Sequence, residues 1–117
     1  MAGETITITT NDRKNIKFNL SHLLFLSSDD NYVEIHFLDK DVRKKLIVRS
    51  SLKHLKEQLI NPISPIQQCH RQYLINIKMF SIVYSSSRSL KLQLKKFDDI
   101  IPVSAPYVKS IKRGIAY

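Results

Sequence analysis

The chain has 117 residues, of which 43% are hydrophobic, and it carries 19 Lys and Arg against 10 Asp and Glu. A chain of this length buries one core, so we expect a single domain over residues 1–117. The hydrophobic content excludes a disordered tail, and two Gly and four Pro are too few for a low-complexity linker. No stretch approaches the roughly 20 apolar residues needed to span a bilayer, so we expect no membrane contact by this segment.

The cysteine content and the N-terminal residues indicate the cellular compartment. The single cysteine, Cys69, excludes an internal disulfide. The start, Met-Ala-Gly-Glu-Thr, lacks the basic segment and apolar run of a secretory signal. Both features favour a cytoplasmic protein.

The net charge of +9 is distributed unevenly. Residues 1–41 hold four basic and seven acidic residues, whereas residues 42–117 hold fifteen basic and three acidic ones. The later segment should attract polyanions, and nucleic acid is the first candidate. Charge alone leaves RNA, anionic lipid and an acidic protein open, and the simplest alternative is a Lys-rich face that only keeps the domain soluble.

Alternation of apolar and polar residues predicts strands through the first half of the chain. In chain order these lie over residues 5–9, 16–20, 23–26, 32–38 and 45–49. Asn11-Asp12 supplies turn chemistry for a first hairpin, and residues 39–41 turn a second one. Residues 27–31 favour a loop, because their short polar side chains bond local backbone.

The clearest helix follows the second hairpin. Ser50 or Ser51 can accept an N-cap hydrogen bond, and the apolar residues that recur at helical spacing until Asn61-Pro62 are Leu52, Leu55, Leu59 and Ile60. Further strands are predicted over residues 73–77, 80–84, 90–94 and 100–103, the last preceded by a turn at Asp98-Asp99. Ser104 offers a cap for a terminal helix with Val108, Ile111 and Ile115 on one face.

This element order predicts a β-dominated α+β domain without internal repeats. Catalysis needs a nucleophile beside a base, or paired carboxylates. Asp29-Asp30 and Asp98-Asp99 lie in predicted turns, where solvation is their simplest role. Cys69 and His70 are adjacent on a strand and point to opposite faces, so they cannot form such a pair. We therefore expect that the protein is not an enzyme.

The sequence also lacks the patterns of common cofactor sites. His22, His36, His54, Cys69 and His70 form neither a C-x-x-C nor an H-x-x-x-H pattern, which argues against zinc. Glycine occurs only at positions 3 and 114, so no glycine-rich loop can cradle a phosphate. We expect no metal and no cofactor.

What remains is a set of Arg, Asn, His and Tyr side chains in the predicted loops at residues 31–32, 70–72 and 104–109. Such side chains read base edges and bind phosphates. The competing interpretation is that Tyr32 and Tyr73 pack in the core and that His70 satisfies a buried carbonyl. Asn76, a polar residue within an apolar stretch, is predicted to pin the backbone of a neighbouring loop.

Residues 68–76, Gln-Cys-His-Arg-Gln-Tyr-Leu-Ile-Asn, closely resemble the His-Arg-Ser-Tyr-apolar-Val-Asn signature of the LytTR family of bacterial DNA-binding domains. Residues 25–33 resemble its upstream Glu-Ser-x-x-x-Tyr-Val segment, with Leu26 in place of the Glu. Ser51-Leu52 with Leu55 resembles its Ser-Leu-x-x-Leu helix, and residues 101–104 match its closing Pro-Val-Ser. These segments cover roughly residues 18–112.

The resemblance implies an elongated arrangement of short antiparallel β-sheets with one central and one C-terminal helix. It implies sequence-specific binding of double-stranded DNA by inter-strand loops inserted in the major groove, and transcription regulation in a bacterial two-component or related signalling system. The expected partner is promoter DNA with repeats, which a second copy of the chain can share. The resemblance also implies a receiver or sensor domain as a partner that commonly precedes the module, and we expect it to be absent from this chain.

Carried over by position, the resemblance gives four base-reading candidates, Asn31, Tyr32, His70 and Arg71. The phosphate-binding candidates are Ser104, Tyr107, Lys109, Lys112 and Arg113. Ala105 and Pro106 stand where the family usually has basic residues, which puts a third base contact in question.

Two other functions compete with this one. An RNA-binding β domain would stack unpaired bases on exposed aromatic residues, for which the candidates are Tyr32, Tyr84 and Tyr107. A protein-interaction β domain would present its basic surface to an acidic partner, and competition by duplex DNA of random sequence would distinguish it.

Overall fold

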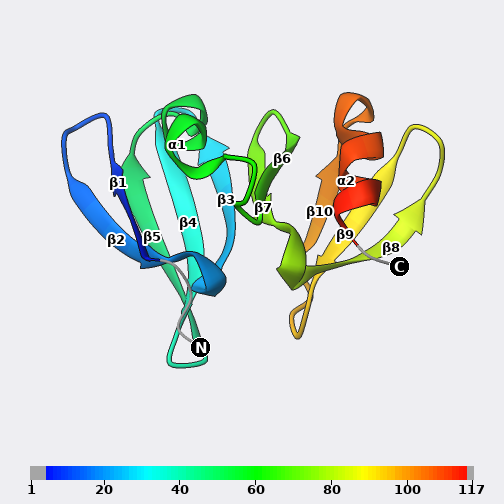
Figure 1. Ribbon diagram of the computed structural model, residues 1–117, viewed down its shortest axis with the longest axis horizontal. Coiled ribbons are helices and arrows are strands. Elements are labelled where there is room, and N and C mark those ends of the chain that lie inside the picture. The colour runs from blue at the N-terminus through cyan, green and yellow to red at the C-terminus, as the bar shows by residue number, and fades with distance from the viewer. Residues whose placement is uncertain (1–4, 116–117) are drawn as a thin grey trace.

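The computed structural model describes residues 5–115, in which ten strands and two short α-helices occur (Figure 1). The strands are β1 (Thr5–Thr9), β2 (Asn15–Asn19), β3 (Leu23–Asp29), β4 (Tyr32–Asp39), β5 (Val42–Arg49), β6 (Ile66–His70), β7 (Tyr73–Asn76), β8 (Phe80–Ser85), β9 (Leu90–Leu94) and β10 (Ile100–Val103). The helices are α1 (Leu52–Leu59) and α2 (Val108–Gly114), and 3₁₀ turns are η1 (Leu20–His22), η2 (Ile77–Met79) and η3 (Ala105–Tyr107). Residues 1–4 and 116–117 lie outside this range. The prediction that the chain lacks a secretory signal concerns residues 1–4 and is therefore outside the described residues.

The strands form antiparallel sheets with the orders β1-β2, β5-β4-β3-β7-β6 and β10-β9-β8. The five-stranded sheet occupies the middle of the molecule, with the β1-β2 hairpin on one side and β8 to β10 on the other (Figure 1). The molecule measures 40 × 33 × 27 Å along its principal axes. The predicted α+β class, with short antiparallel sheets, one central helix and one C-terminal helix, is confirmed.

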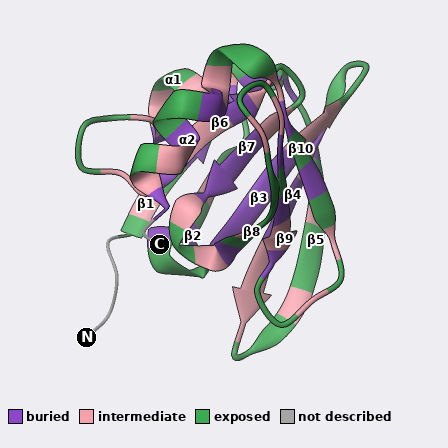
Figure 2. Cartoon of the chain, turned by 90° about the vertical axis from the view of Figure 1, so that its right-hand side faces the viewer, coloured by how far each residue is buried: buried purple, intermediate pink, exposed green. Residues whose placement is uncertain are grey.

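Two hydrophobic cores lie on opposite faces of the five-stranded sheet. One is closed by α1 and the β1-β2 hairpin, and its members include Leu26, Ile35 and Leu55. The other is closed by α2 and the sheet of β8 to β10, and its members include Phe25 and Ile111. Figure 2 shows buried residues along β3 and β7, between these layers. Packing on both faces explains why the central strands are more continuously apolar than the outer ones.

Helix α1 forms as its sequence predicts. The Ser51 hydroxyl accepts a hydrogen bond from the backbone N–H of His54 at 3.1 Å, which caps the first turn. Leu52, Leu55 and Leu59 are buried in the first core. The helix ends at Leu59, and Ile60 is its C-cap, just before Asn61-Pro62.

The predicted loop at residues 27–31 is mostly wrong. β3 continues to Asp29, because Ser27, Ser28 and Asp29 pair with β4 opposite Glu34, Val33 and Tyr32. Only Asp30-Asn31 remain as the turn. In this stretch, β4 supplies hydrogen-bonding partners for the backbone N–H and C=O groups of β3. This pairing overrides the preference of Ser and Asp for local hydrogen bonds.

Two predictions near the C-terminal end are also wrong. Ser104 makes no side-chain capping bond, because η3 separates it from α2, whose N-cap is Tyr107. The turn before β10 is made by Lys95-Lys96, with Lys96 at φ 71°, while Asp99 pairs with an arginine. The predicted apolar face of α2 is confirmed, since Val108, Ile111 and Ile115 are all buried.

Asn76 has the structural role predicted for it. Its side-chain amide donates to the backbone carbonyls of Leu20 at 3.3 Å and Leu23 at 2.9 Å, and its carbonyl accepts the N–H of Lys78 at 3.0 Å. The residue is 1% exposed. One buried side chain therefore joins η1, the start of β3 and η2.

An ion pair joins the five-stranded sheet to the segment just before β10 in the three-stranded sheet. The guanidinium of Arg43 on β5 donates to both carboxylate oxygens of Asp99 at 2.5 and 2.8 Å. His36 on β4 lies against it, with Nδ1 3.2 Å from the guanidinium and Nε2 3.1 Å from Glu34. Asp99 is therefore not simply solvated in a turn, as its sequence context suggests.

We expect Asn76→Ala to lower the free energy of unfolding by about 2 kcal/mol, because three hydrogen bonds of a buried side chain are lost, among them the donor to the Leu23 carbonyl. Asn19 is a matched control, since its side chain also accepts a backbone N–H at the start of a 3₁₀ turn but in an exposed setting. Asn19→Ala should cost about 0.5 to 1 kcal/mol. Urea unfolding measures both, and equal losses would contradict a special role for Asn76.

We expect stability to fall as the pH drops below about 6.5, because the pKa of His36 is lowered in the folded protein. Burial is the main cause, and Arg43 also disfavours the charged ring, while Glu34 and Asp99 partly oppose this. The unfolded chain then takes up the proton first, so the stabilisation is complete above that pH and is lost as the pH falls through the folded pKa. Urea midpoints should decline less between pH ~7.5 and ~5 in His36→Gln than in the parent. Identical slopes would exclude His36 as the cause.

Candidate nucleic-acid interface

The turn between β3 and β4 presents the first two base-reading candidates. Asp30 adopts φ 53°, a left-handed conformation that Asp tolerates better than most residues. The carbonyl of Asn31 accepts the backbone N–H of Ser50 at 3.1 Å, which fixes the turn beside the end of β5. The Asn31 side chain is exposed, and Tyr32 is 48% exposed rather than packed in the core.

The turn between β6 and β7 presents Arg71. A register shift between Gln68 and His70 marks a bulge in β6, and such bulges redirect the following side chains. His70 Nδ1 accepts the backbone N–H of Gln72 at 3.1 Å, so the ring holds the two-residue turn. Arg71 is exposed and forms no hydrogen bond or ion pair with any residue between 5 and 115.

Two backbone hydrogen bonds bring the predicted segments together. Ser28 N–H donates to the Gln72 carbonyl at 2.9 Å, which places the β3-β4 and β6-β7 turns side by side. Ser104 N–H donates to the Cys69 carbonyl at 3.0 Å, which places the end of β10 next to β6. The three segments therefore lie along one edge of the molecule, the upper edge in Figure 1.

The third segment differs from the other two in what it exposes. Ala105 and Pro106 occupy its outer positions, and neither can donate a side-chain hydrogen bond to a base. Tyr107 is half-buried against the second core, and Ser104 is partly buried. The exposed cationic side chains near this segment lie farther along α2, at Lys109 and Arg113.

The basic candidates on α2 are not equivalent. Lys109 and Arg113 are exposed. The ammonium of Lys112 instead donates to the Ser86 carbonyl at 3.1 Å and ties α2 to the turn between β8 and β9. Lys112 thus has a structural contact that the sequence did not reveal.

Sequence reasoning missed two arginines at this edge. Arg88 is exposed in the β8-β9 turn, which is closed by a hydrogen bond from Ser86 N–H to the Ser89 carbonyl at 2.8 Å. Arg49, at the end of β5, lines a hollow of about 270 Å³ together with Asn31 and Asp30. The signal for Arg88 was available, because an arginine within a serine-rich stretch between two strands indicates an exposed turn.

The charge along the edge is graded. Near the β3-β4 turn, Arg13, Lys14 and Arg49 are balanced by Asp12, Asp29 and Asp30. Toward α2 the exposed charged residues are Arg71, Arg88, Lys109 and Arg113, all of them basic. Attraction for phosphate is therefore strongest at the α2 end.

The nucleophile and ligand candidates of the sequence take no part in a reactive cluster. Cys69 is buried with its sulfur 3.9 Å from the Pro102 carbonyl, and burial raises the pKa of its thiol to about 12. Within residues 5–115, no group of three or more His, Cys, Asp or Glu side chains is placed to hold a metal ion. In the same range no α-helix has the length and apolar character to span a membrane.

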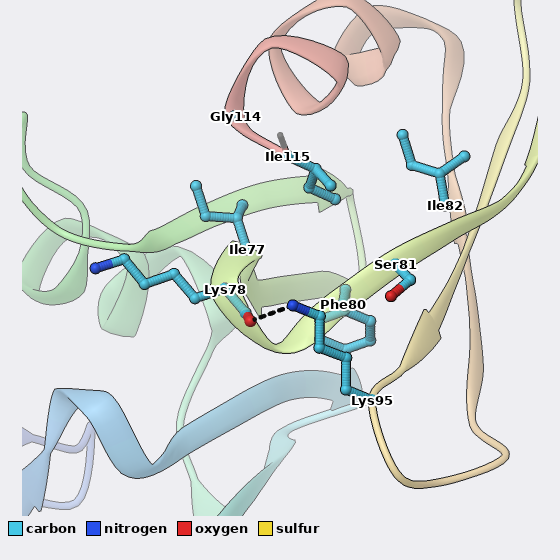
Figure 3. Close-up of a pocket in the computed structure, with 8 residues that line it drawn as sticks. All are labelled: Ile77, Lys78, Phe80, Ser81, Ile82, Lys95, Gly114 and Ile115. Carbon is cyan, nitrogen blue, oxygen red and sulfur yellow. Dashed lines mark hydrogen bonds between the residues drawn. The ribbon is translucent and has the colours of Figure 1, made fainter. Parts of the chain in front are cut away.

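A hollow of about 520 Å³ lies between η2, the start of β8 and the end of α2 (Figure 3). Its walls include Ile77, Ile82 and Ile115, and at its rim Lys95 donates to the Lys78 carbonyl at 3.1 Å. No carboxylate, imidazole or thiol lines it. The polar side chains in its lining are those of Lys78, Ser81 and Lys95.

Comparison with known proteins gives two findings. A family model described as the LytTr DNA-binding domain matches residues 13–116. Among solved structures, the LytTr DNA-binding domain of a methyl-accepting/DNA response regulator from Bacillus cereus is similar, with a TM-score of 0.65 and 17% identity over 98% of this chain and 100% of that one. No curated protein matches the sequence.

Proposed function

Because this chain belongs to the LytTR family of DNA-binding domains, we propose that it recognises duplex DNA of a defined sequence and regulates transcription, with inter-strand turns entering the major groove. The observation that carries the proposal is the alignment of the β3-β4 and β6-β7 turns through the Ser28 to Gln72 hydrogen bond. This alignment exposes Asn31, Tyr32 and Arg71 on one edge. The family is one of DNA-binding domains, and we infer no catalytic activity.

Arg71 is the residue to which we assign the most specific contact. Its planar guanidinium can donate two hydrogen bonds to O6 and N7 of guanine, and no partner within residues 5–115 competes for it. The Asn31 amide can pair in the same way with N6 and N7 of adenine. His70, bonded to the backbone of its own turn, acts by holding Arg71 in place.

The basic residues of the α2 end supply the phosphate contacts. We assign this role to Lys109, Arg113 and Arg88, while Ser104, Tyr107 and Lys112 support the segment that carries them. Phosphate contacts position a protein on DNA but carry no base code. With Ala105 and Pro106 in the third segment, specificity rests on the first two turns.

In its biological setting, we propose that two copies of the domain bind adjacent repeats in a promoter. The similar Bacillus cereus domain is part of a response regulator, which supports a place in a two-component or related signalling system, in the cytoplasm. A receiver or sensor region is the further partner that we propose. RNA stacking is less well supported, because Tyr32 and Tyr84 lie on different sheets and Tyr107 is half-buried.

Selection of duplexes from a random pool tests the function directly. We expect a defined consensus whose affinity falls steeply between about 50 and 200 mM salt, because phosphate contacts release counterions. Lys109→Ala should reduce the salt slope by about one and leave the consensus unchanged. Lys112→Ala, in contrast, should lower the melting temperature, because the hydrogen bond from its ammonium to the Ser86 carbonyl is lost. A pool without enrichment, or an affinity insensitive to salt, would refute the proposal.

We expect Arg71→Ala to remove about 1 to 3 kcal/mol of discrimination at one base pair, with a much smaller effect on random duplex. Arg71→Lys should restore little, because an ammonium cannot reproduce a two-donor fork. The measurement compares the three proteins on the selected site and on its single-base variants, with folding checked by circular dichroism. If all three rank the variants identically, Arg71 does not read a base.

A further inference from the structure

The five-stranded sheet and the β8 to β10 sheet pack together across the second hydrophobic core, and polar contacts join them at two separate places. At the proposed DNA edge they are joined by the hydrogen bond between Ser104 and Cys69. At the opposite end they are joined by the ion pair of Arg43, on β5, with Asp99, which lies just before β10. The two base-reading turns belong to the first sheet, and the basic α2 segment follows the second.

The opposite end is built around the Arg43 guanidinium. Its two nitrogens bond both oxygens of Asp99, and its central carbon lies 5.7 Å from the ring of Phe25 and 5.0 Å from that of Phe97. Phe25 belongs to the five-stranded sheet, and Phe97 to the link between β9 and β10. The cation therefore contacts an aromatic ring from each side of the junction.

His36 completes this arrangement. Its ring stacks on Phe25 with centroids 4.1 Å apart, and its Nδ1 faces the guanidinium of Arg43. Its Nε2 faces Glu34, which also lies 3.9 Å from Lys45. The ion pair holds the pKa of Asp99 below its usual range and raises that of Arg43. Both charges are thus matched within the junction.

We propose that Arg43, Asp99 and His36 form a clamp that sets the angle between the two sheets, and through it the spacing between the base-reading turns and the α2 segment on DNA. This inference rests on the proposed function. Arg43 lies six residues from the interface end of β5, and His36 lies four residues from the interface end of β4. At about 3.4 Å per residue, the strands span about 14 to 20 Å from clamp to interface. A change of angle at the clamp is therefore carried to the interface as a displacement of the turns relative to α2.

Arginine is suited to this position and lysine is not. A planar guanidinium can bond a carboxylate through two parallel hydrogen bonds while its faces rest on aromatic rings. This geometry fixes direction as well as distance, which a lysine ammonium would leave free. Lys44, the next residue on β5, provides a matched control, because its ion pair with Asp39 lies within the β4-β5 hairpin and does not cross the junction.

The clamp is tested by spin labels on Asp29→Cys and Ser110→Cys, two exposed positions that lie on the two sides of the junction. Cys69 stays unlabelled because it is buried. We expect one narrow distance distribution in the parent and in Lys44→Ala, and a broader or shifted one in Arg43→Ala, Arg43→Lys and Asp99→Asn. The isosteric Asp99→Asn variant keeps the test valid should Arg43→Ala fail to fold. Unchanged distributions in the folded clamp variants would overturn the clamp.

The consequence for DNA is measured on the unlabelled proteins. We expect the affinity of the clamp variants for the selected duplex to fall about tenfold, a size typical of coupling between distant sites, while random duplex is bound nearly as before. The exchange Arg43→Asp with Asp99→Arg should recover part of the loss. Equal losses on both duplexes, or no loss, would overturn the link to recognition. A parent protein without sequence preference would refute the proposed function instead, and the label distances would still decide whether the clamp exists.

Discussion

The architecture depends on β3, a strand that must be buried on both faces. Leu23 and Leu26 belong to the core under α1, and Leu24 and Phe25 belong to the core under α2. Strict alternation would put Leu23 and Phe25 on the same face, and the register shift between them in the pairing with β4 allows this different division. The four consecutive apolar residues of β3 therefore contribute to both hydrophobic cores. Through these cores, β3 connects the two layers that carry the segments of the proposed DNA edge.

Sequence patterns predicted the elements whose two faces differ. β9 alternates Leu with Lys or Gln, α1 carries its own cap, and both form as expected. β6 was not among the apolar stretches, because Gln67 and Gln68 occupy its centre and only its pairing with β7 makes it a strand. The same holds for the polar end of β3. Strand pairing joins residues distant in sequence, and local patterns do not record it.

The candidate site was predictable in content but not in geometry. The resemblance of short motifs selected Asn31, Tyr32 and Arg71, whereas residue chemistry alone left core packing equally plausible. The backbone bonds that bring the segments to one edge, and the attachment of Lys112 to Ser86, join positions far apart in the sequence. Partners of this kind cannot be assigned without the fold, and the same is true of Asp99, which the sequence placed in a solvated turn.

The turns that carry Asn31 and Arg71 are each two residues long and are fixed by backbone hydrogen bonds to a neighbouring segment. Such short connections leave the backbone almost no conformational freedom to lose on association, so little backbone entropy opposes binding. They also leave the protein little ability to adapt its shape. Adjustment at the contact must then come from the double helix, whose ease of bending varies with base sequence. Base pairs that no side chain touches would in this way contribute to the choice of site.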